Sequence, residues 1–328
     1  MKTICVLPGD GIGPEVTGCA VEVLSAVTGE LRFTSSDIGT SAVERHGDPL
    51  PPETLEAMKT ADSCLFGAVT SSASKGVRSA VLTFRKELDL FANVRPVRTL
   101  VPGAGVRPID IVIVRENSEG LYTQDEVHED GGVTTRRRVT SAACRRISEF
   151  AIAYARASAR KDICCVHKAN VLRESDGLFL RTFREAMAGS PDLTYSDHLV
   201  DSAAMKLVTG PESFDVIVTL NLYGDILSDV AAGVAGGLGF APSGNIGPKH
   251  SVFEPAHGSA PDIAGRGIAN PTAAILSGAM MLRHIGMADE ANRVEHAVYA
   301  TYRAGHLTRD VGGTLGSREF TDKVVRIT

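Results

Sequence analysis

Short apolar segments that alternate with amphipathic helical stretches are the feature that most limits how this chain can fold. Five segments are almost continuously apolar, and they lie at residues 4–9, 63–69, 110–117, 162–170 and 214–221. Such runs are typical of parallel strands that are buried on both faces of a sheet. Helical stretches lie between them, for example at 141–158 and 174–188. The alternation predicts an α/β protein, and the length of 328 residues predicts about two domains.

The amino-acid composition excludes several classes of protein. Hydrophobic residues make up 43% and charged residues 22% of the chain, which is ordinary globular composition. The net charge of −5, without a long basic run, argues against a nucleic-acid partner. No apolar run reaches the ~18 residues of a membrane span, and the N-terminal apolar stretch is too short for a signal peptide. Because the six cysteines form no C-x-x-C pair, we expect reduced, mostly buried thiols in a cytoplasmic protein without a membrane partner.

The glycine-rich stretch LPGDGIGPEV, residues 7–16, looks at first like a dinucleotide-binding loop. Gly9, Gly11 and Gly13 alternate, so the third glycine arrives one residue early for G-x-G-x-x-G, and Pro14 follows where that glycine is needed. Proline is instead a good first helical residue. We interpret the stretch as a tight strand-to-helix turn. A second glycine-rich stretch, 231–247, fits either a linker or hinge between domains or close backbone packing.

Polar side chains follow three of the predicted strands, at the point where each strand ends. The clusters are 115–122 (RENSEGLY), 167–170 (HKAN) and 221–225 (NLYGD). Ligands of open α/β sheets bind outside the carboxyl ends of the strands. The three clusters are therefore expected to line one cleft.

Two acidic residues, Asp225 and Asp229, are four apart and lie on one face of a predicted helix. Two like charges at this spacing repel each other unless a cation lies between them. Carboxylate oxygens suit Mg²⁺ or Mn²⁺, although two solvated carboxylates would give the same pattern. A third acid, Asp201, likewise ends an apolar run and begins a helix.

Four arginines form a second candidate set. Arg78, Arg85 and Arg95 lie within 78–96, and Arg115 follows the third predicted strand. A guanidinium group binds a carboxylate through two parallel hydrogen bonds, so an acidic substrate follows if these side chains converge. A single arginine on the surface is usually just solvated.

Five motifs together resemble the isocitrate and 3-isopropylmalate dehydrogenase family, the metal-dependent β-decarboxylating dehydrogenases, with homoisocitrate dehydrogenase as a third member. They are PGDGIGPEV, RENSEGLY, HKANV, NLYGDILSD and EPAHGSAPDIAGRGIANPTAAILSGAMML, and they occur in order along the whole chain. The resemblance implies the two-domain α/β sandwich of isopropylmalate dehydrogenase, not a Rossmann fold. Residues 1–91 and 236–328 would form the large, cofactor-binding domain, and 92–235 the small domain with the dimer interface.

The resemblance also implies a homodimer or larger homo-oligomer in which each active site borrows residues from a second copy. Residues 123–137 would lie in the interface arm of the family, and their glycine and charge content suggests mobility. A small hydroxy di- or tricarboxylate is the implied substrate.

The family resemblance assigns roles to residues of this chain one by one. The carboxylates of the malate moiety would be held by Arg85, Arg95 and Arg115. The metal, Mg²⁺ or Mn²⁺, would be bound by Asp225 and Asp229 with Asp201 of the other subunit.

The same resemblance implies two catalytic residues. Lys168, which also reaches across the interface, would take the hydroxyl proton as hydride leaves C2 for NAD⁺. Tyr122 would protonate the enolate that remains after CO₂ has left.

The resemblance implies that the cofactor binds on the segment HGSAPDIAG, from His257 to Gly265, rather than on the turn at 7–16. Asp262 can accept both hydroxyls of an adenosine ribose and repel a 2′-phosphate, and NADP-preferring relatives carry Lys-Tyr in place of Asp262-Ile263. NAD is therefore the expected cofactor. The expected contacts are Thr70, Asn170, His257, Gly258, Ser259, Ala260, Asp262, Ile263 and Asn270.

Specificity within the family lies in the group at C3 of the malate, which meets residues 67–90. Ser79 resembles the serine of the isocitrate type, whereas Val81 and Leu82 resemble the apolar pair of the isopropylmalate type. Lys75 and Arg78 favour an anionic group, because an unpaired charge against an isopropyl group is costly. We therefore expect a third acid group, as in isocitrate, homoisocitrate or a phosphonate analogue. 3-Isopropylmalate is the alternative. If Lys75 and Arg78 only face solvent, they do not favour an anionic group over an isopropyl group.

A non-catalytic regulatory subunit is a further possibility within the family. Such chains usually lose metal-binding or catalytic residues. This chain retains Tyr122, Lys168 and all three acids, which favours an enzyme.

Overall fold

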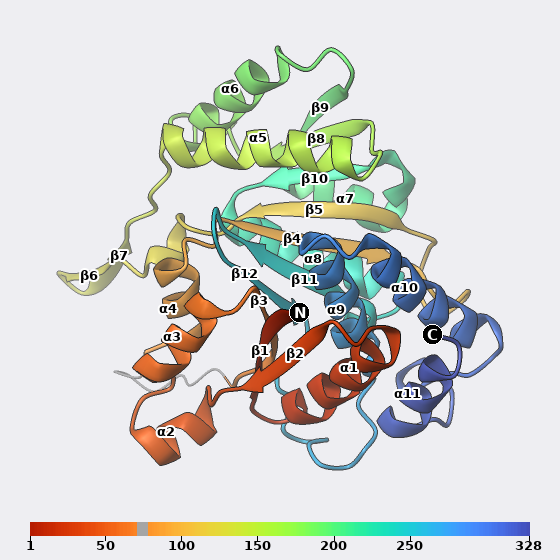
Figure 1. Cartoon of the computed structure of the whole chain (residues 1–328). Helices are drawn as coiled ribbons and strands as arrows, with labels where there is room; N and C mark the ends of the chain where they lie inside the picture. The colour runs from red at the N-terminus through yellow and green to blue at the C-terminus, as the bar shows by residue number, and fades with distance from the viewer. Residues whose placement is uncertain (71–77) are drawn as a thin grey trace.

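The computed structural model describes residues 1–70 and 78–328. In this part of the chain the predicted α/β class is confirmed, because a ten-stranded mixed sheet runs through the molecule (Figure 1). Across the sheet the strands lie in the order β2 (Leu31–Ser35), β1 (Lys2–Gly9), β3 (Ser63–Ala68), β12 (Ser251–Pro255), β11 (Pro242–Ile246), β4 (Ala92–Arg98), β5 (Asp110–Glu116), β10 (Val216–Thr219), β8 (Asp162–His167) and β9 (Thr194–Leu199).

Helices connect the strands. They are α1 (Gly13–Val27), α2 (Thr40–His46), α3 (Pro52–Thr60), α4 (Ala80–Glu87), α5 (Ser141–Ala157), α6 (Ser175–Met187), α7 (Val200–Thr209), α8 (Asn221–Ala235), α9 (Thr272–His284), α10 (Ala288–Arg303) and α11 (Ser317–Val325). The described residues also include the short 3₁₀ turns η1 (Leu121–Thr123), η2 (Pro211–Ser213), η3 (Leu238–Phe240) and η4 (Arg309–Val311). The helices predicted at 141–158 and 174–188 correspond to α5 and α6.

Strand β10 shows why continuous apolar runs indicate strands covered on both sides. Val216 and Val218 pack into the core beside α5 and α6, whereas Ile217 points to the other face, into the core beside α7 and α8. Each of the five predicted strands forms in the structure, and each has at least one parallel neighbour.

The centre of the sheet differs from the all-parallel arrangement that these runs suggest. Strand β4 pairs antiparallel with β5, and β11 pairs antiparallel with both β4 and β12. The segments ANVRPVR and PSGNI carry polar residues, so they do not have the apolar pattern of a buried strand. They are buried because hydrogen bonds satisfy their polar side chains, for example between Asn93 and Ser243.

The glycine-rich stretch 231–247 is folded. It contains the end of α8, the turn η3 and strand β11, in the middle of the sheet. A Cβ atom at Gly244 would lie 2.7 Å from the ring of Phe253 on β12. Close backbone packing is therefore confirmed at Gly244, and a hinge between domains stays a prediction.

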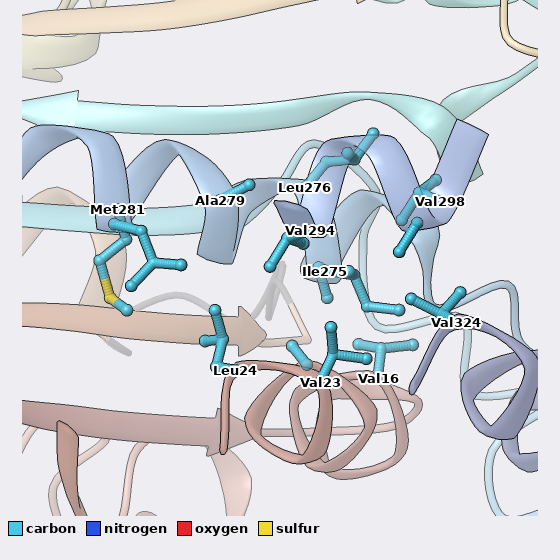
Figure 2. Close-up of a cluster of buried hydrophobic side chains, with 14 of the residues drawn as sticks. Val16, Val23, Leu24, Ile275, Leu276, Ala279, Met281, Val294, Val298 and Val324 are labelled. Atoms are coloured by element: carbon cyan, nitrogen blue, oxygen red, sulfur yellow. The ribbon is translucent and has the colours of Figure 1, made fainter. Parts of the chain in front are cut away.

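Four helices build the core beside the N-terminal strands. Figure 2 shows Val16, Val23 and Leu24 of α1 facing Ile275 of α9, with Val298 of α10 nearby. Helices α10 and α11 close this core from the C-terminal end of the chain. The first and last parts of the chain thus form one packed unit.

The sheet is continuous across the predicted domain boundary. The five strands from β2 to β11 come from 1–91 and 236–328, and the five from β4 to β9 come from 92–235. The two halves meet where β11 pairs with β4, at Gly244–Val94, Asn245–Asn93 and Ile246–Ala92. The division into two domains stays a prediction.

Residues of the predicted interface arm form a separate antiparallel hairpin of β6 (Glu126–Glu129) and β7 (Gly132–Thr135), which projects from the body of the molecule (Figure 1). All six cysteines are free and buried, as expected. None of the helices in the described ranges has the length and apolar character that crossing a membrane requires.

Candidate active site

Helix α8 carries two of the predicted metal ligands just beyond the carboxyl end of strand β10. It begins at Asn221, directly after β10, and Asp225 and Asp229 lie one turn apart on it, as predicted. Leu227 and Ala231 anchor the helix in the core, whereas Ile226 is 54% exposed. The acidic pair therefore lies between a buried face and an exposed apolar one.

Asp225 is the centre of a cluster of converging side chains. Arg115, at the end of β5, donates from Nη1 to Asp225 Oδ1 at 2.5 Å, and the hydroxyl of Tyr122 in η1 donates to Asp225 Oδ2. The Arg115 side chain is 1% exposed, and its Nε and Nη2 atoms donate to Asn221 Oδ1 at 3.1 and 2.8 Å. Two of the three predicted strand-end clusters, 115–122 and 221–225, therefore meet.

Arg95 on β4 approaches the same acids from the neighbouring strand. Its Nη1 lies 3.3 Å from Asp229 Oδ1 and 2.6 Å from Ser228 Oγ, and its Nη2 lies 3.4 Å from Asp225 Oδ1. Arg85 of α4 is bound instead to Glu254 of β12 at 3.0 Å. The Nε atom of Arg85 is buried without a hydrogen-bond partner in the described part of the chain.

The charges in this cluster act on one another. Burial, together with the positive charges of Arg85 and Arg95, lowers the pKa of Arg115 to about 10. Burial alone would raise the pKa of the Asp225 carboxyl, but the Arg115 charge and the hydrogen bond from Tyr122 hold it below its ordinary value. The three guanidinium groups are thus close enough to repel one another, and a bound anion would relieve this repulsion.

Two further groups carry shifted pKa values. Burial raises the pKa of Asp229, and the negative charge of Asp225 adds to this shift. The positive charge of Arg95 opposes the shift but does not cancel it. Burial also raises the pKa of Tyr122, although Arg115 opposes this shift. Tyr122 therefore keeps its proton at neutral pH.

Lys168 and Asp201 form an ion pair of their own. Lys168 follows β8 and Asp201 begins α7, and the Lys168 Nζ lies 2.5 Å from Asp201 Oδ1. Within residues 1–70 and 78–328 of one chain, no group of three or more His, Cys, Asp or Glu side chains gathers as a metal site. The third predicted cluster, 167–170, approaches cluster 221–225 through Asp176, which accepts from the Lys168 N–H at 2.6 Å and from Arg137, whose guanidinium lies 5.1 Å from the centre of the Tyr223 ring. Asn170 lies exposed on the turn after β8.

The predicted cofactor segment packs on the N-terminal turn. The backbone N–H of Ile12 donates to the carbonyl of Ser259 at 2.8 Å, and the Ser259 hydroxyl lies 2.9 Å from that of Thr70. Gly11 has a φ of +59°, and a Cβ there would lie 1.9 Å from the Ser259 carbonyl oxygen. The turn at 7–16 therefore supports the segment 257–265. Ala260 in this segment has a φ of +37°.

Other members of the predicted cofactor set surround this contact. Gly258 and Asp262 are exposed, and Ile263 is partly buried. The His257 Nε2 atom is buried without a partner among the described residues, and burial lowers the pKa of its imidazole, which favours the neutral form. Asn270 is held by Asp310, whose Oδ2 accepts its amide at 2.9 Å.

The residues expected to select the substrate lie at the start of α4. The Ser79 hydroxyl caps this helix by accepting from the N–H of Leu82 at 3.3 Å. Arg78 is exposed and binds Asp48 at 3.1 Å, so it is not the unpaired charge on which the substrate prediction rested. Val81 is partly buried in the core beneath. Lys75 lies outside the described residues.

Several residues of the site were not predicted. Asn93, Asn245 and Glu254 connect Arg95 to Arg85, and Ser228 on α8 accepts from Arg95. Asn221, which accepts from Arg115, was part of the predicted cluster 221–225. One signal for Asn93 was available, since it is two residues before Arg95 on a strand and so shares its face. Asn245 offered no such signal, because its pairing with Asn93 spans 152 residues of the sequence.

A mixed α/β sheet whose strand ends carry clustered arginines beside two acids is typical of an enzyme that binds small anionic ligands, and comparison with known proteins specifies the family. The family model described as isocitrate/isopropylmalate dehydrogenase matches residues 3–324. The chain therefore belongs to the isocitrate/isopropylmalate dehydrogenase family, and the resemblance of its motifs is confirmed.

Individual relatives cover nearly the whole chain. It is 46% identical to the 3-isopropylmalate dehydrogenase of Methanothermobacter thermautotrophicus (98% of this chain, 97% of the relative). It is 49% identical to the isocitrate/homoisocitrate dehydrogenase of Thermus thermophilus, with the same coverage. The crystal structure of isocitrate dehydrogenase from Methylococcus capsulatus is similar with a TM-score of 0.96 and 41% identity, over 100% of this chain and 99% of that one.

These comparisons confirm the predicted fold type and the class of enzyme. The chain is a β-decarboxylating dehydrogenase, an oxidoreductase that acts on a CH–OH group. The family uses NAD(P) and a divalent metal and acts on small hydroxy acids.

Proposed function

We propose that this chain catalyses the NAD- and Mg²⁺- or Mn²⁺-dependent oxidative decarboxylation of a 3-substituted malate to a 2-oxo acid. The guanidinium groups of Arg95 and Arg115 beside the carboxylates of Asp225 and Asp229 carry this proposal, with Arg85 close enough to affect Arg115. Cations for the acid groups of a substrate and carboxylates for a divalent ion suit a hydroxy acid that chelates a metal.

In this reaction the chain's own residues hold the substrate and move protons. Arg85, Arg95 and Arg115 bind the carboxylates of the malate moiety. The phenol of Tyr122 keeps its proton at neutral pH and donates it to C3 after the β-carboxylate has left as CO₂. Lys168 accepts the proton of the C2 hydroxyl.

Asp225 and Asp229 fit a divalent cation. Their carboxylates lie on successive turns of α8, and oxygen ligands of this kind suit Mg²⁺ and Mn²⁺. Burial raises the pKa of Asp229, so this carboxylate gains from a positive charge beside it. Asp201 of a second copy is the proposed third ligand. A cation bound there supplies Lewis-acid polarisation of the oxygen on C2.

A second copy of the chain is part of this proposal. Met205 and Val208 on α7 are 59% and 43% exposed, and Ile226 on α8 is also exposed. Helices α7 and α8 pack side by side, so these apolar groups gather on neighbouring helices. A homodimer that covers them would bring Asp201 of α7, and Lys168 that pairs with it, toward the partner's site.

The segment 257–265 is the proposed site for NAD, which supplies the hydride acceptor when bound. Its exposed Asp262 can accept hydrogen bonds from both hydroxyls of a ribose and repels a 2′-phosphate. Thr70 is hydrogen-bonded to Ser259 of this segment, and Asn270 is held by a hydrogen bond to Asp310.

We further propose that the group at C3 of the substrate carries a third acid. Arg78 and Ser79 lie at the N-terminal end of α4, where the helix dipole favours a negative charge. The Arg78–Asp48 pair is exposed, and exposed pairs contribute only ~0–1 kcal/mol, so a substrate anion can recruit Arg78 at small cost.

3-Isopropylmalate is the second candidate, and one observation favours it. The charge of Arg78 is already matched by Asp48, and Val81 presents apolar surface at the same end of α4. An isopropyl group would then need no cation beside it.

One experiment separates the two candidates. NADH formation is measured with Mg²⁺ and isocitrate, homoisocitrate, 3-isopropylmalate or malate, for the wild type, Arg78→Gln and Arg45→Gln. Arg45 makes an equivalent exposed pair with Asp37 at 2.9 Å and serves as the matched control. We expect Arg78→Gln to raise KM for the tricarboxylates while malate is unaffected. A wild type that prefers 3-isopropylmalate would support the second candidate, and turnover of none of these acids would refute the proposed function.

A further inference from the structure

A chain of buried polar side chains connects two of the three arginines proposed to bind the substrate. Its members between Arg95 and Arg85 are Asn93, Asn245 and Glu254. Asn93 and Asn245 are 0% exposed, and Glu254 is buried as well. Buried amides and carboxylates are costly unless they are hydrogen-bonded, so each contact here restrains its partners.

The contacts form one unbroken path. The Nε of Arg95 donates to Asn93 Oδ1 at 2.8 Å, and Asn93 Nδ2 donates to Asn245 Oδ1 at 3.1 Å. Asn245 Nδ2 donates to Glu254 Oε1 at 2.8 Å, and the same oxygen accepts from Arg85 Nη2 at 3.0 Å. The path therefore joins one guanidinium group to the other through side chains alone.

The amide of Asn93 has no freedom to rotate within this path. Its Nδ2 also donates to Ser243 Oγ at 2.8 Å, so both of its donors and its acceptor are engaged. Because Asn93 binds the Nε of Arg95, the two Nη groups of that guanidinium face Ser228, Asp229 and Asp225 and any anion beside them. A fixed second layer of this kind holds a binding group in its productive orientation.

The path also crosses the junction between the two halves of the sheet. Asn93 and Asn245 are register partners where β4 meets β11. Arg85 lies in the predicted range 1–91 and Arg95 in 92–235. One hydrogen-bonded network thus connects the two arginines, although they come from different parts of the fold.

We propose that Asn93 is a positioning residue for the hydroxy-acid site, which orients the guanidinium of Arg95 and, through Asn245 and Glu254, couples it to Arg85. This inference rests on the proposed function, because it concerns how the same site holds its substrate. Asn93 itself touches no reacting atom.

Asn117 provides a matched control. It is a buried asparagine whose Nδ2 donates to the same Asn245 Oδ1, at 3.1 Å, and to the carbonyl of Leu90 at 3.0 Å. None of its described contacts is to an arginine. Asn93→Leu and Asn117→Leu both remove buried amide hydrogen bonds at similar volume, and both are expected to lower Tm.

The experiment compares these variants alone and combined with Arg95→Lys, which lacks the Nε–H that Asn93 binds. KM is measured for the preferred acid and for NAD, and Kd for the same acid with Mg²⁺ replaces KM where turnover is too slow. Loss of a hydrogen bond to a charged group predicts that Asn93→Leu raises KM for the acid roughly tenfold or more. KM for NAD should stay within about twofold of wild type for both variants.

The combined variants give the decisive result. If Asn93 acts through Arg95, then Asn93→Leu has little further effect once Arg95 is Lys, whereas Asn117→Leu has the same small effect in both backgrounds. Equal effects of Asn93→Leu and Asn117→Leu on KM, or an undiminished effect of Asn93→Leu beside Arg95→Lys, would overturn this inference alone. A wild type that neither binds nor oxidises any of the acids would overturn the proposed function and this inference with it.

Discussion

Replacing Gly11 by Ala tests whether the turn at 7–16 supports the segment proposed to bind NAD. Gly11 has a φ of +59°, and an added Cβ would lie 1.9 Å from the carbonyl oxygen of Ser259. That contact is far inside van der Waals distance and involves backbone, so either the turn or the segment 257–265 must move. The hydrogen bond from Ile12 N–H to the same oxygen, at 2.8 Å, would be lost with the movement.

The size of the effect follows from these two contacts. A left-handed alanine costs roughly 1–2 kcal/mol, and the lost hydrogen bond costs about 1 kcal/mol. A loss of roughly 2–3 kcal/mol in the free energy of unfolding lowers Tm by about 3–5 °C in a chain of this length. A displaced segment that loses about 1.4 kcal/mol of NAD binding would raise KM for NAD about tenfold.

Thermal unfolding and KM for NAD are the measurements, and Gly18→Ala is the control. Gly18 lies inside α1, and a Cβ there meets nothing within 4 Å. This substitution should raise stability by roughly 0.5–1 kcal/mol, since alanine is the better helix former. An unchanged Tm and KM in Gly11→Ala would show that the segment does not depend on the turn and would refute the reasoning.

Three further predictions concern the proposed site. Asp225→Asn removes a proposed metal ligand and should lower kcat roughly a hundredfold or more; unchanged turnover at saturating Mg²⁺ would exclude that role, and circular dichroism would verify the fold. Asp262→Lys should lower kcat/KM with NAD and raise it with NADP, each by about tenfold, because a cation replaces a carboxylate beside the ribose. The same cofactor preference in both proteins would remove Asp262 from cofactor selection. Lys168→Met should slow NADH formation in a single turnover by roughly 10²–10⁴-fold, the usual contribution of a general base. A normal rate would show that Lys168 does not accept the hydroxyl proton.

The sequence by itself determined those features that depend on neighbours along the chain. The apolar runs identified five strands, and the four-residue spacing of Asp225 and Asp229 placed them on one face of α8. The five motifs identified the family, which the comparison with relatives confirmed. Each of these is local, because strand and helix periodicity and motif identity are read from adjacent residues.

Only the tertiary structure decided which of these groups meet. Arg115 and Asp225 are 110 residues apart, and Asn93 and Asn245 are 152 apart, yet each pair is in hydrogen-bond contact. The antiparallel strands β4 and β11 were not predicted, because their polar residues become compatible with burial only through partners distant in the sequence. The pairing of Arg78 with Asp48 likewise altered the basis for the substrate prediction. The physical reason is common to all three: whether a charge or an amide is satisfied depends on what the fold places opposite it.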